Sequence, residues 1–261
     1  MRNYLPFKLI LIIFCFFGNA QNNTIAVGEK LTFTASYSVS GLLTDIAEVV
    51  MQTNNVNTSS STLLQLKCTA STYGNWDRTF KIRDLYESYV NPKTLTPYLH
   101  KRDIDEGGYY KFMQYQFNPK ARTVKSLKRK RNSKGKYWEE KNNLTISADT
   151  RDLVSTLYNI RTLPIDQASP GDAKNFKILF DNEEQAARIT YLGKEVINTI
   201  IGKKECYKLS LSLNNSDVLK GNDKNLLWLT ADDNKIPVYA KFRIAVGSGE
   251  LKLKSASGLK N

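Results

Sequence analysis

The sequence is poor in the residues that carry most enzyme and metal chemistry. It contains one histidine, His100, and three cysteines among 261 residues. A single imidazole excludes a metal site built on a histidine pair, and the sequence has neither a G-x-S-x-G nucleophile motif nor a glycine-rich phosphate loop. We therefore expect no catalytic residues, no cofactor and no metal site.

Cysteine is scarce in the body of the chain, where only Cys68 and Cys206 follow the first twenty residues. Cys68 shares its alternation face with Leu64 and Leu66, whereas Cys206 lies on the face opposite Leu209. If each strand buries its apolar face, the two sulfur atoms point to different sides of a sheet. We therefore expect two unpaired thiols, although an oxidising compartment would permit a bridge.

Long hydrophobic runs are also absent, except for Leu9–Phe17 near the start of the chain. Arg2 and Lys8 precede this run, and the small residues of Gly18-Asn19-Ala20 follow it. The run is shorter than the roughly 20 apolar residues that a membrane-spanning helix needs. The pattern predicts a cleaved secretory signal over residues 1–20 and no transmembrane segment. The mature protein is then exported to the periplasm or the extracellular space, where it can associate with a membrane surface.

Acidic residues are outnumbered, with 25 Asp and Glu against 38 Lys and Arg. The net charge of +13 becomes +11 once Arg2 and Lys8 leave with the signal. An exported basic protein meets anionic lipid headgroups, lipopolysaccharide or acidic glycans more readily than nucleic acid. Excess lysine can equally serve only to keep a β-rich protein soluble. Both interpretations stay open, and the sequence does not indicate an oligomeric state.

Alternation of apolar and polar residues with a period of two dominates the chain after the signal. It predicts strands near residues 29–39, 45–53, 62–71, 77–83, 86–91, 97–104, 108–117, 121–131, 136–147, 174–181, 186–200, 203–213, 225–231, 235–246 and 249–255. Most gaps between them are short, so neighbouring strands should pair antiparallel. No repeat or linker is visible, and we expect a single β-rich domain over residues 21–261.

One segment breaks the alternation. Residues 149–164 begin with Asp149 as a candidate N-cap and end at Pro164, which predicts a helix over about residues 150–161. Its predicted apolar stripe is Leu153, Val154, Leu157, Tyr158 and Ile160, and its predicted polar face is Asp152, Ser155, Thr156 and Asn159. A lone amphipathic helix among strands needs a concave partner. The expected fold is mainly β: a strongly curved antiparallel sheet, or incomplete β-barrel, with this helix packed in or across its concave side.

Arg161 is out of place on this helix, because it follows Val154 and Leu157 on the apolar side. A buried guanidinium must reach solvent, bond to carbonyl groups at the helix end or meet a carboxylate. We favour an ion pair that locks the helix to the sheet, with a ligand-binding arginine as the alternative. If a ligand occupies the space under the helix, the residues expected to bind it are Arg161, Leu153, Leu157 and Tyr158.

Six stretches along the chain resemble one family in their order and spacing. They are "GEKLTFTASY" (28–37), "ESYVNPKTLTPYL" (87–99), "DEGGYYKF" (105–112), "DLVSTLYNIRTL" (152–163), "YLGKEVINTIIGKKECYKL" (191–209) and "LLWLTADDNKIPVYAKF" (226–242). Nearly the whole mature chain thereby resembles the exported bacterial proteins of the domain of unknown function 3108 family. The resemblance implies a β-rich envelope protein and transfers no catalytic residue.

A second, weaker likeness is architectural. A curved sheet that ends in a "W-L-x-x-D…P" hairpin is similar to the periplasmic carriers of lipoproteins, which hold acyl chains in a half-barrel. This likeness implies a carrier role by analogy of fold alone. The chain departs from the typical family pattern in a lysine-rich hairpin over residues 118–138.

Cations point to both faces of that hairpin. Along its first strand Lys125, Arg129 and Arg131 face one way, and Arg122, Lys128 and Lys130 face the other. Lys125, Lys128, Arg129, Lys130 and Arg131, with aromatic residues next to them, are the residues we expect to contact an anionic surface. The alternative is an edge strand that lysines protect against sheet-to-sheet aggregation.

Two acidic clusters invite a chemical interpretation. Asp103, Asp105 and Glu106 could serve glycoside hydrolysis or bind Ca²⁺, and Asp232-Asp233-Asn234 invites the same calcium interpretation. A solvated strand end explains the first cluster better, and a tight hairpin turn explains the second. We expect no metal at either.

The sequence thus favours a non-catalytic binding or carrier module for an apolar or anionic ligand of the cell envelope. A structural or assembly protein that docks to an anionic surface through its lysine-rich hairpin is the alternative. A carboxylate-based glycan hydrolase is the least favoured, because it needs Asp103, Asp105 or Glu106 to meet a second acid in a cleft.

Overall fold

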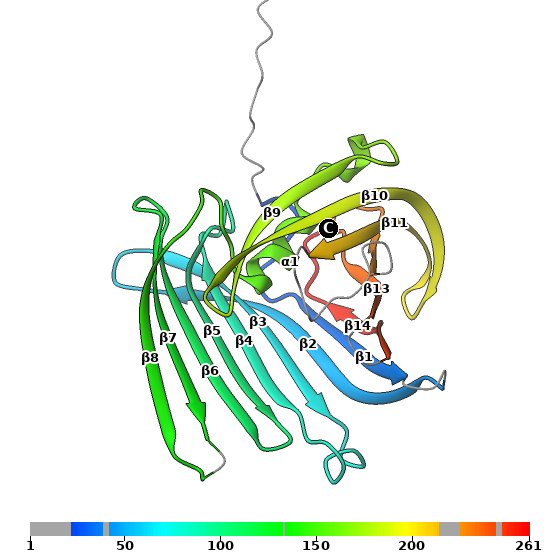
Figure 1. Ribbon diagram of the computed structural model, residues 1–261. Helices are drawn as coiled ribbons and strands as arrows, with labels where there is room; N and C mark the ends of the chain where they lie inside the picture. Colours follow the sequence, from blue (N-terminus) through cyan, green and yellow to red (C-terminus); the bar gives the residue numbers. More distant parts are fainter. Residues whose placement is uncertain (1–21, 39–41, 133, 214–224, 244–246) are drawn as a thin grey trace, which may run out of the picture.

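The computed structural model describes residues 22–38, 42–132, 134–213, 225–243 and 247–261, so the predicted signal lies outside the described residues (Figure 1). The strands are β1 (Lys30–Ser38), β2 (Thr44–Asn57), β3 (Thr62–Thr72), β4 (Arg83–Val90), β5 (Pro97–Glu106), β6 (Tyr109–Asn118), β7 (Thr123–Arg131), β8 (Tyr137–Thr145), β9 (Ala173–Phe180), β10 (Glu183–Thr199), β11 (Gly202–Leu213), β12 (Leu226–Thr230), β13 (Pro237–Arg243) and β14 (Ser248–Ser257). The helices are α1 (Leu153–Arg161) and the 3-10 turn η1 (Ile165–Gln167).

All the strands of the described residues belong to one 14-stranded antiparallel sheet, in the order β8-β7-β6-β5-β4-β3-β2-β1-β14-β13-β12-β11-β10-β9. The chain therefore runs as a meander from β1 to β8, crosses over through α1, and returns as a second meander from β9 to β14. The last strand pairs with the first, and β8 and β9 are left as the two edges. The sheet is strongly curved but not closed into a barrel (Figure 1).

The curvature has identifiable local causes. Pairing shifts register between Thr32 and Phe33, between Ala35 and Ser36, and between Tyr191 and Gly193. An extra residue in one strand bends that strand and increases its twist. Gly193 has a backbone φ of 120°, which only glycine adopts without strain. These irregularities let a long meander wrap around a central helix.

Helix α1 lies on the concave side of the sheet, where it contacts β3, β4 and β9 (Figure 1). One cluster joins Val154 and Tyr158 of the helix to Leu31, Met51 and other side chains of β1 to β4. A second cluster joins Ile160 and η1 to β9, β10, β11 and β12. The expected fold, a curved antiparallel sheet with a helix in its hollow side, is confirmed.

The helix begins three residues later than Asp149 would place it. Asp152 is the N-cap, and its carboxylate accepts a hydrogen bond of 2.9 Å from the backbone N–H of Ser155. Asp149 instead adopts a left-handed backbone with a φ of 62°. The carboxylate at position 152 has the reach to satisfy a free N–H of the first turn, which is why it defines the start.

The predicted division of α1 into an apolar and a polar face is wrong in part. Ser155 and Thr156, expected on the polar face, are buried, whereas Leu157, expected in the core, is 38% exposed. The buried hydroxyls are satisfied locally, because Ser155 and Thr156 both donate to the backbone carbonyl of Asp152. A satisfied hydroxyl can be buried at little cost, so the helix is covered on nearly every side.

The strand predicted at residues 77–83 does not form, and only Arg83 of this stretch belongs to β4. The Asp77 carboxylate accepts bonds of 2.6 Å from Arg83 and 2.5 Å from the Thr72 hydroxyl. These contacts hold the stretch as turns between β3 and β4.

Within the described ranges, no helix is long and apolar enough to cross a bilayer.

Candidate functional site

One row of side chains crosses the interior face of the sheet from β2 to β6. Cross-strand pairing places Met51 opposite Cys68, Cys68 opposite Tyr86, Tyr86 opposite Arg102 and Arg102 opposite Met113. Directly opposed residues point to the same face, and Met51 packs with the helix, so this is the concave face. The row runs from apolar side chains on β2 and β3 to a charged one on β5.

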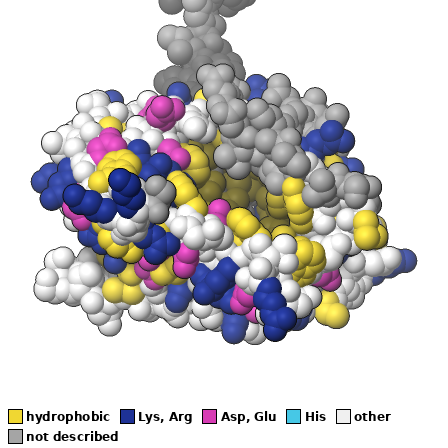
Figure 2. Space-filling view, turned by 60° about the horizontal axis from the view of Figure 1, so that its bottom comes forward, with side chains coloured by type: hydrophobic (Ala, Val, Ile, Leu, Met, Phe, Trp, Pro, Cys, Tyr) yellow, Lys and Arg dark blue, Asp and Glu magenta, His cyan; other side chains and the backbone are white. Residues whose placement is uncertain are grey.

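The interior of the curved sheet is not completely filled. Figure 2 shows the molecule with the lower end of Figure 1 turned forward, and this face is hollowed near its centre, with hydrophobic side chains lining the hollow. The surroundings of Cys68 also indicate unfilled space inside the sheet. Burial raises the pKa of its thiol to about 12, yet its side chain is only half-buried. A side chain that is surrounded by protein and still partly exposed borders an internal space.

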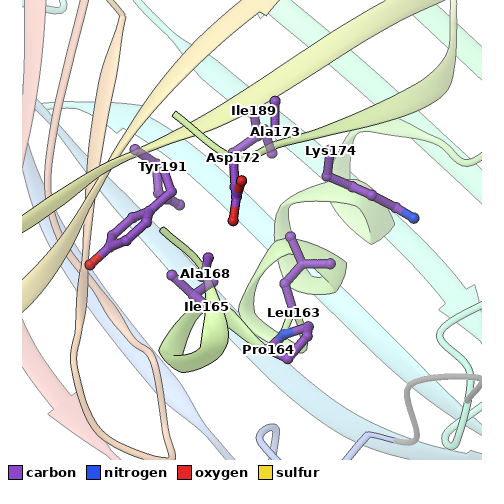
Figure 3. A pocket seen from close by; sticks show the side chains of 10 residues that line it. Leu163, Pro164, Ile165, Ala168, Asp172, Ala173, Lys174, Ile189 and Tyr191 are labelled. Atoms are coloured by element: carbon purple, nitrogen blue, oxygen red, sulfur yellow. The ribbon is translucent and has the colours of Figure 1, made fainter. Parts of the chain in front are cut away.

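An apolar pocket lies where the end of the helical segment meets β9, β10 and β11 (Figure 3). Its volume is about 260 Å³, and its lining is Leu163, Pro164, Ile165, Ala168, Asp172, Ala173, Lys174, Ile189, Tyr191 and Leu209. Leu163, Pro164 and Ile165 form one side, and Ile189 and Tyr191 of β10 form the other. Ligand pockets generally have volumes of about 300–1,000 Å³, so this one suits a short apolar group rather than a whole lipid.

A charge cluster with two buried cations and an exposed carboxylate connects the two halves of the sheet. Arg102 of β5 and Lys111 of β6 both bond to Asp181 in the turn between β9 and β10. The Arg102 guanidinium also lies 4.4 Å from the centre of the Phe180 ring. Its Nε is buried and has no hydrogen-bond partner among the described residues. The cluster fixes the β9–β10 turn against β5 and β6 and leaves one donor unpaired.

Two carboxyl groups meet on the same interior face. Burial, followed by a hydrogen bond and charge from Glu106, raises the pKa of Asp84 to about 7. Glu106 therefore meets a second acid, as the hydrolase interpretation requires. A second carboxyl close by disfavours the ionised form of the first, which explains the raised pKa of Asp84 without a catalytic role. Asp103 lies on the other face, opposite Phe112.

His100 has polar neighbours that alternation alone did not reveal. Ser88 donates a bond of 2.5 Å to Oδ1 of Asp152, and its Oγ lies 3.0 Å from Nδ1 of His100. Burial lowers the pKa of His100, and the Asp152 charge opposes that shift. In a catalytic triad the imidazole lies between serine and carboxylate, whereas here the three groups contact one another, with Nδ1 of His100 also 3.4 Å from Oδ1 of Asp152. The three buried groups anchor the N-terminus of α1.

The predicted ligand-binding residues are distributed between a buried and a partly open group. Arg161 is 1% exposed and forms a two-bond ion pair with Glu29, at 2.6 and 2.7 Å, so the favoured ion pair is present. It also donates to the backbone carbonyl of Asn234, at 2.9 Å. Tyr158 is fully buried, whereas Leu153 is half-buried and Leu157 is exposed.

The cations of the lysine-rich hairpin do not form one surface. Lys128 and Lys130 lie on the interior face of β7, and Lys125, Arg129 and Arg131 lie on the other. Lys128 pairs with Glu140 at 3.3 Å, and Arg129 pairs with Glu139 at 2.6 Å. The edge-strand alternative is wrong for β7, because it lies between β6 and β8 and the edge is β8.

Sequence reasoning missed the partners of these residues. Glu29, Ser88 and Asp181 carry the contacts of Arg161, Asp152 and Arg102, and each lies far from its partner along the chain. Glu29 directly precedes an apolar strand, which was the one available signal. Both cysteines are unpaired, as predicted, and no three His, Cys, Asp or Glu side chains of the described part lie close enough to hold a metal ion.

A family model described as protein of unknown function (DUF3108) matches residues 32–254. The chain belongs to this family. No curated protein matches the sequence. The family assigns no activity, and it covers nearly every strand of the sheet.

Two solved structures are similar to this fold. One is a β-barrel-like protein of the domain of unknown function DUF1849 from Brucella abortus, with a TM-score of 0.52, 8% sequence identity, and coverage of 89% of this chain and 98% of that one. The other is an exported protein with a YmcC-like fold from Bacteroides fragilis, with a TM-score of 0.33, 10% identity, and coverage of 90% and 97%. The first likeness shows the fold alone.

Proposed function

We propose that this member of the DUF3108 family is an exported, non-catalytic binding or carrier protein of the cell envelope. Its ligand has an apolar part that occupies the hollow inside the curved sheet. The observation that carries the proposal is Cys68, which is deep inside the molecule and still partly exposed, on the apolar half of an interior row. The hydrophobic lining of the hollow in Figure 2 supports it.

The four residues predicted to bind ligand take different roles in this proposal. Leu157 is 38% exposed and Leu153 is half-buried, so in this proposal these two side chains of α1 are available to contact the ligand. Arg161 and Tyr158 are buried and hold the helix in place. Burying the exposed part of Leu157 against an acyl chain contributes roughly 0.5–1 kcal/mol, so a lipid chain is a suitable occupant if several such side chains contact it.

Two measurements test the proposal. The purified mature protein is extracted with organic solvent, and the extract is examined by mass spectrometry for co-purified lipid. The delipidated protein is then titrated with a fluorescent fatty acid. We expect binding that falls at least tenfold in Cys68→Phe, which fills the hollow, and less than twofold in Thr69→Phe, which points to the other face.

The folded state of both variants is checked by circular dichroism, and Cys68→Met replaces Cys68→Phe if the larger side chain prevents folding. A wild-type protein that yields no lipid and binds no fatty acid would refute the proposal. Equal losses at positions 68 and 69 would refute the assigned location.

A second function, docking to an anionic membrane surface, is favoured by the strand ends near the lysine-rich hairpin. Tyr109, Tyr137 and Trp138 are 48%, 51% and 40% exposed, and Lys130 lies over the Tyr109 ring at 5.9 Å. Exposed aromatic rings beside cations suit a lipid headgroup region. We expect the protein to sediment with anionic vesicles. This binding should be lost in a variant in which four residues are changed together to Glu: Lys128, Arg129, Lys130 and Arg131. Lys203→Glu with Lys204→Glu, which reverses two charges elsewhere, is the control and should keep binding. Binding that survives the fourfold change, or that the control also loses, rules out this docking surface.

A further inference from the structure

A third space lies between the β6–β7 turn, the start of β5 and the segment that leads into α1. Its volume is about 340 Å³. Lys120 and Arg122 come from the turn, Asp149 and Arg151 come from the segment before the helix, and Phe117 comes from the end of β6. These residues lie far apart along the chain and line one space only because the segment before α1 runs past the end of the sheet.

The charge of this cavity is positive. Lys120, Arg122 and Arg151 face a single carboxylate, Asp149, in its lining. Arg151 is held in place by its guanidinium, which donates to the backbone carbonyls of Thr94, at 3.1 Å, and Leu95. The ion pairs of the described residues include none of the three cations. Three cations around one solvent-accessible cleft attract an anion, and Arg151 is already ordered to receive it.

The remaining lining is suited to a ring rather than to a bare ion. Pro97, Phe117, Pro119 and Ile146 supply an apolar wall, and Phe117 is anchored in the cluster that includes Met113 and Val124. The volume exceeds what a phosphate ion needs and lies in the range of small-molecule sites, about 300–1,000 Å³. A sugar ring presents C–H groups to such a wall and hydroxyls to the solvent side.

We propose that this cavity binds a small anionic carbohydrate, with its phosphate or carboxylate group at Lys120, Arg122 and Arg151 and its ring against Phe117. The site is independent of the apolar hollow. Asp149 is the one lining group that opposes the ligand, so its charge should weaken binding. This gives the proposal a variant that is expected to strengthen binding.

The test is isothermal titration of the mature protein with glucose 6-phosphate, glucuronate, glucose and inorganic phosphate. We expect one of the two anionic sugars to bind with a dissociation constant at least tenfold below those of glucose and phosphate. Lys120→Gln combined with Arg122→Asn should weaken that binding at least tenfold. Both positions are exposed, and asparagine tolerates the left-handed backbone of Arg122, whose φ is 54°, so folding should be preserved.

The matched control is Lys125→Gln combined with Lys134→Gln, which removes the same charge outside the cavity and should change binding less than twofold. Asp149→Asn should tighten binding several-fold. Each of three results would overturn the proposal: no binding of either anionic sugar, equal affinity for phosphate alone, or an equal loss in the control. Binding here that persists in Cys68→Phe would also separate this site from the hollow.

Discussion

At the scale of single residues, Arg161 shows that a charged residue at an apolar position of a sequence pattern can predict a structural contact. An arginine on the apolar side of a helix needs a partner, and Glu29 provides it with two bonds while both side chains are 1% exposed. The partner is 132 positions away, just before β1. The sequence of the helix alone indicated that Arg161 needs a partner, but it did not indicate which carboxylate that partner is.

Removing one member of this pair should be costly. We expect Glu29→Gln to lower the free energy of unfolding by about 3–5 kcal/mol, because the Arg161 guanidinium would remain buried without a countercharge. Chemical denaturation of the variant and the wild type measures the difference. Glu29→Met combined with Arg161→Met should cost clearly less than either single change. A single variant as stable as the wild type would mean that the pair contributes little.

At the scale of elements, α1 shows why a helical stripe is not a complete description of burial. Its N-terminus enters a polar pocket of Ser88 and His100, so Asp152 and Ser155 are buried although they belong to the predicted polar face. The stripe predicted that the helix seats in a concave sheet. It could not predict that the sheet also offers polar partners to the other side of the helix.

The Asp152 cap can be separated from the rest of the helix. We expect Asp152→Ala to destabilise the protein by about 1–3 kcal/mol, because it removes the cap and the acceptor of the Ser88 hydroxyl. Asp152→Asn retains a cap oxygen and should cost less. Denaturant unfolding of the two variants makes the comparison, and equal losses would show that the cap geometry is unimportant.

At the scale of the whole molecule, the sheet is curved into a barrel-like shape without closing. Edges β8 and β9 do not pair with each other, and the β9–β10 turn is fastened instead by Asp181 to Arg102 and Lys111 on the opposite wall. The neighbouring Asn182 accepts a bond of 2.5 Å from Ser126 of β7. Side-chain contacts thus replace the backbone ladder that would close a full barrel.

The contacts of Asp181 lead to a testable prediction about local opening of strand β9. Asp181→Asn retains the shape of the turn, since asparagine tolerates its left-handed φ of 51°, but leaves two buried cations without a countercharge. We expect amide hydrogen exchange in β9 and in the start of β10 to accelerate at least tenfold, while exchange in β2 and β3 changes little. The control is Glu183→Gln, two residues after Asp181 at the start of β10. Unchanged exchange in β9 would contradict this account of the closure.

The sequence by itself determined the strand-rich, curved character of the described residues, and the α-helix with its seat on the concave side. These properties follow from local alternation and from the need of one amphipathic helix for a hollow partner. The same alternation predicted a strand at residues 77–83, where Asp77 instead bonds to Arg83 and Thr72.

Only the tertiary structure decided which distant residues meet. The pairing of Arg161 with Glu29, the junction of Asp181 with β5 and β6, and the cationic cavity around Lys120 and Arg151 each join segments that are far apart in the chain. Alternation specifies the face of a strand to which a side chain points, but it carries no information on which strand lies across the interior. That choice depends on the register and bending of the whole sheet, and so do the sites proposed for this protein.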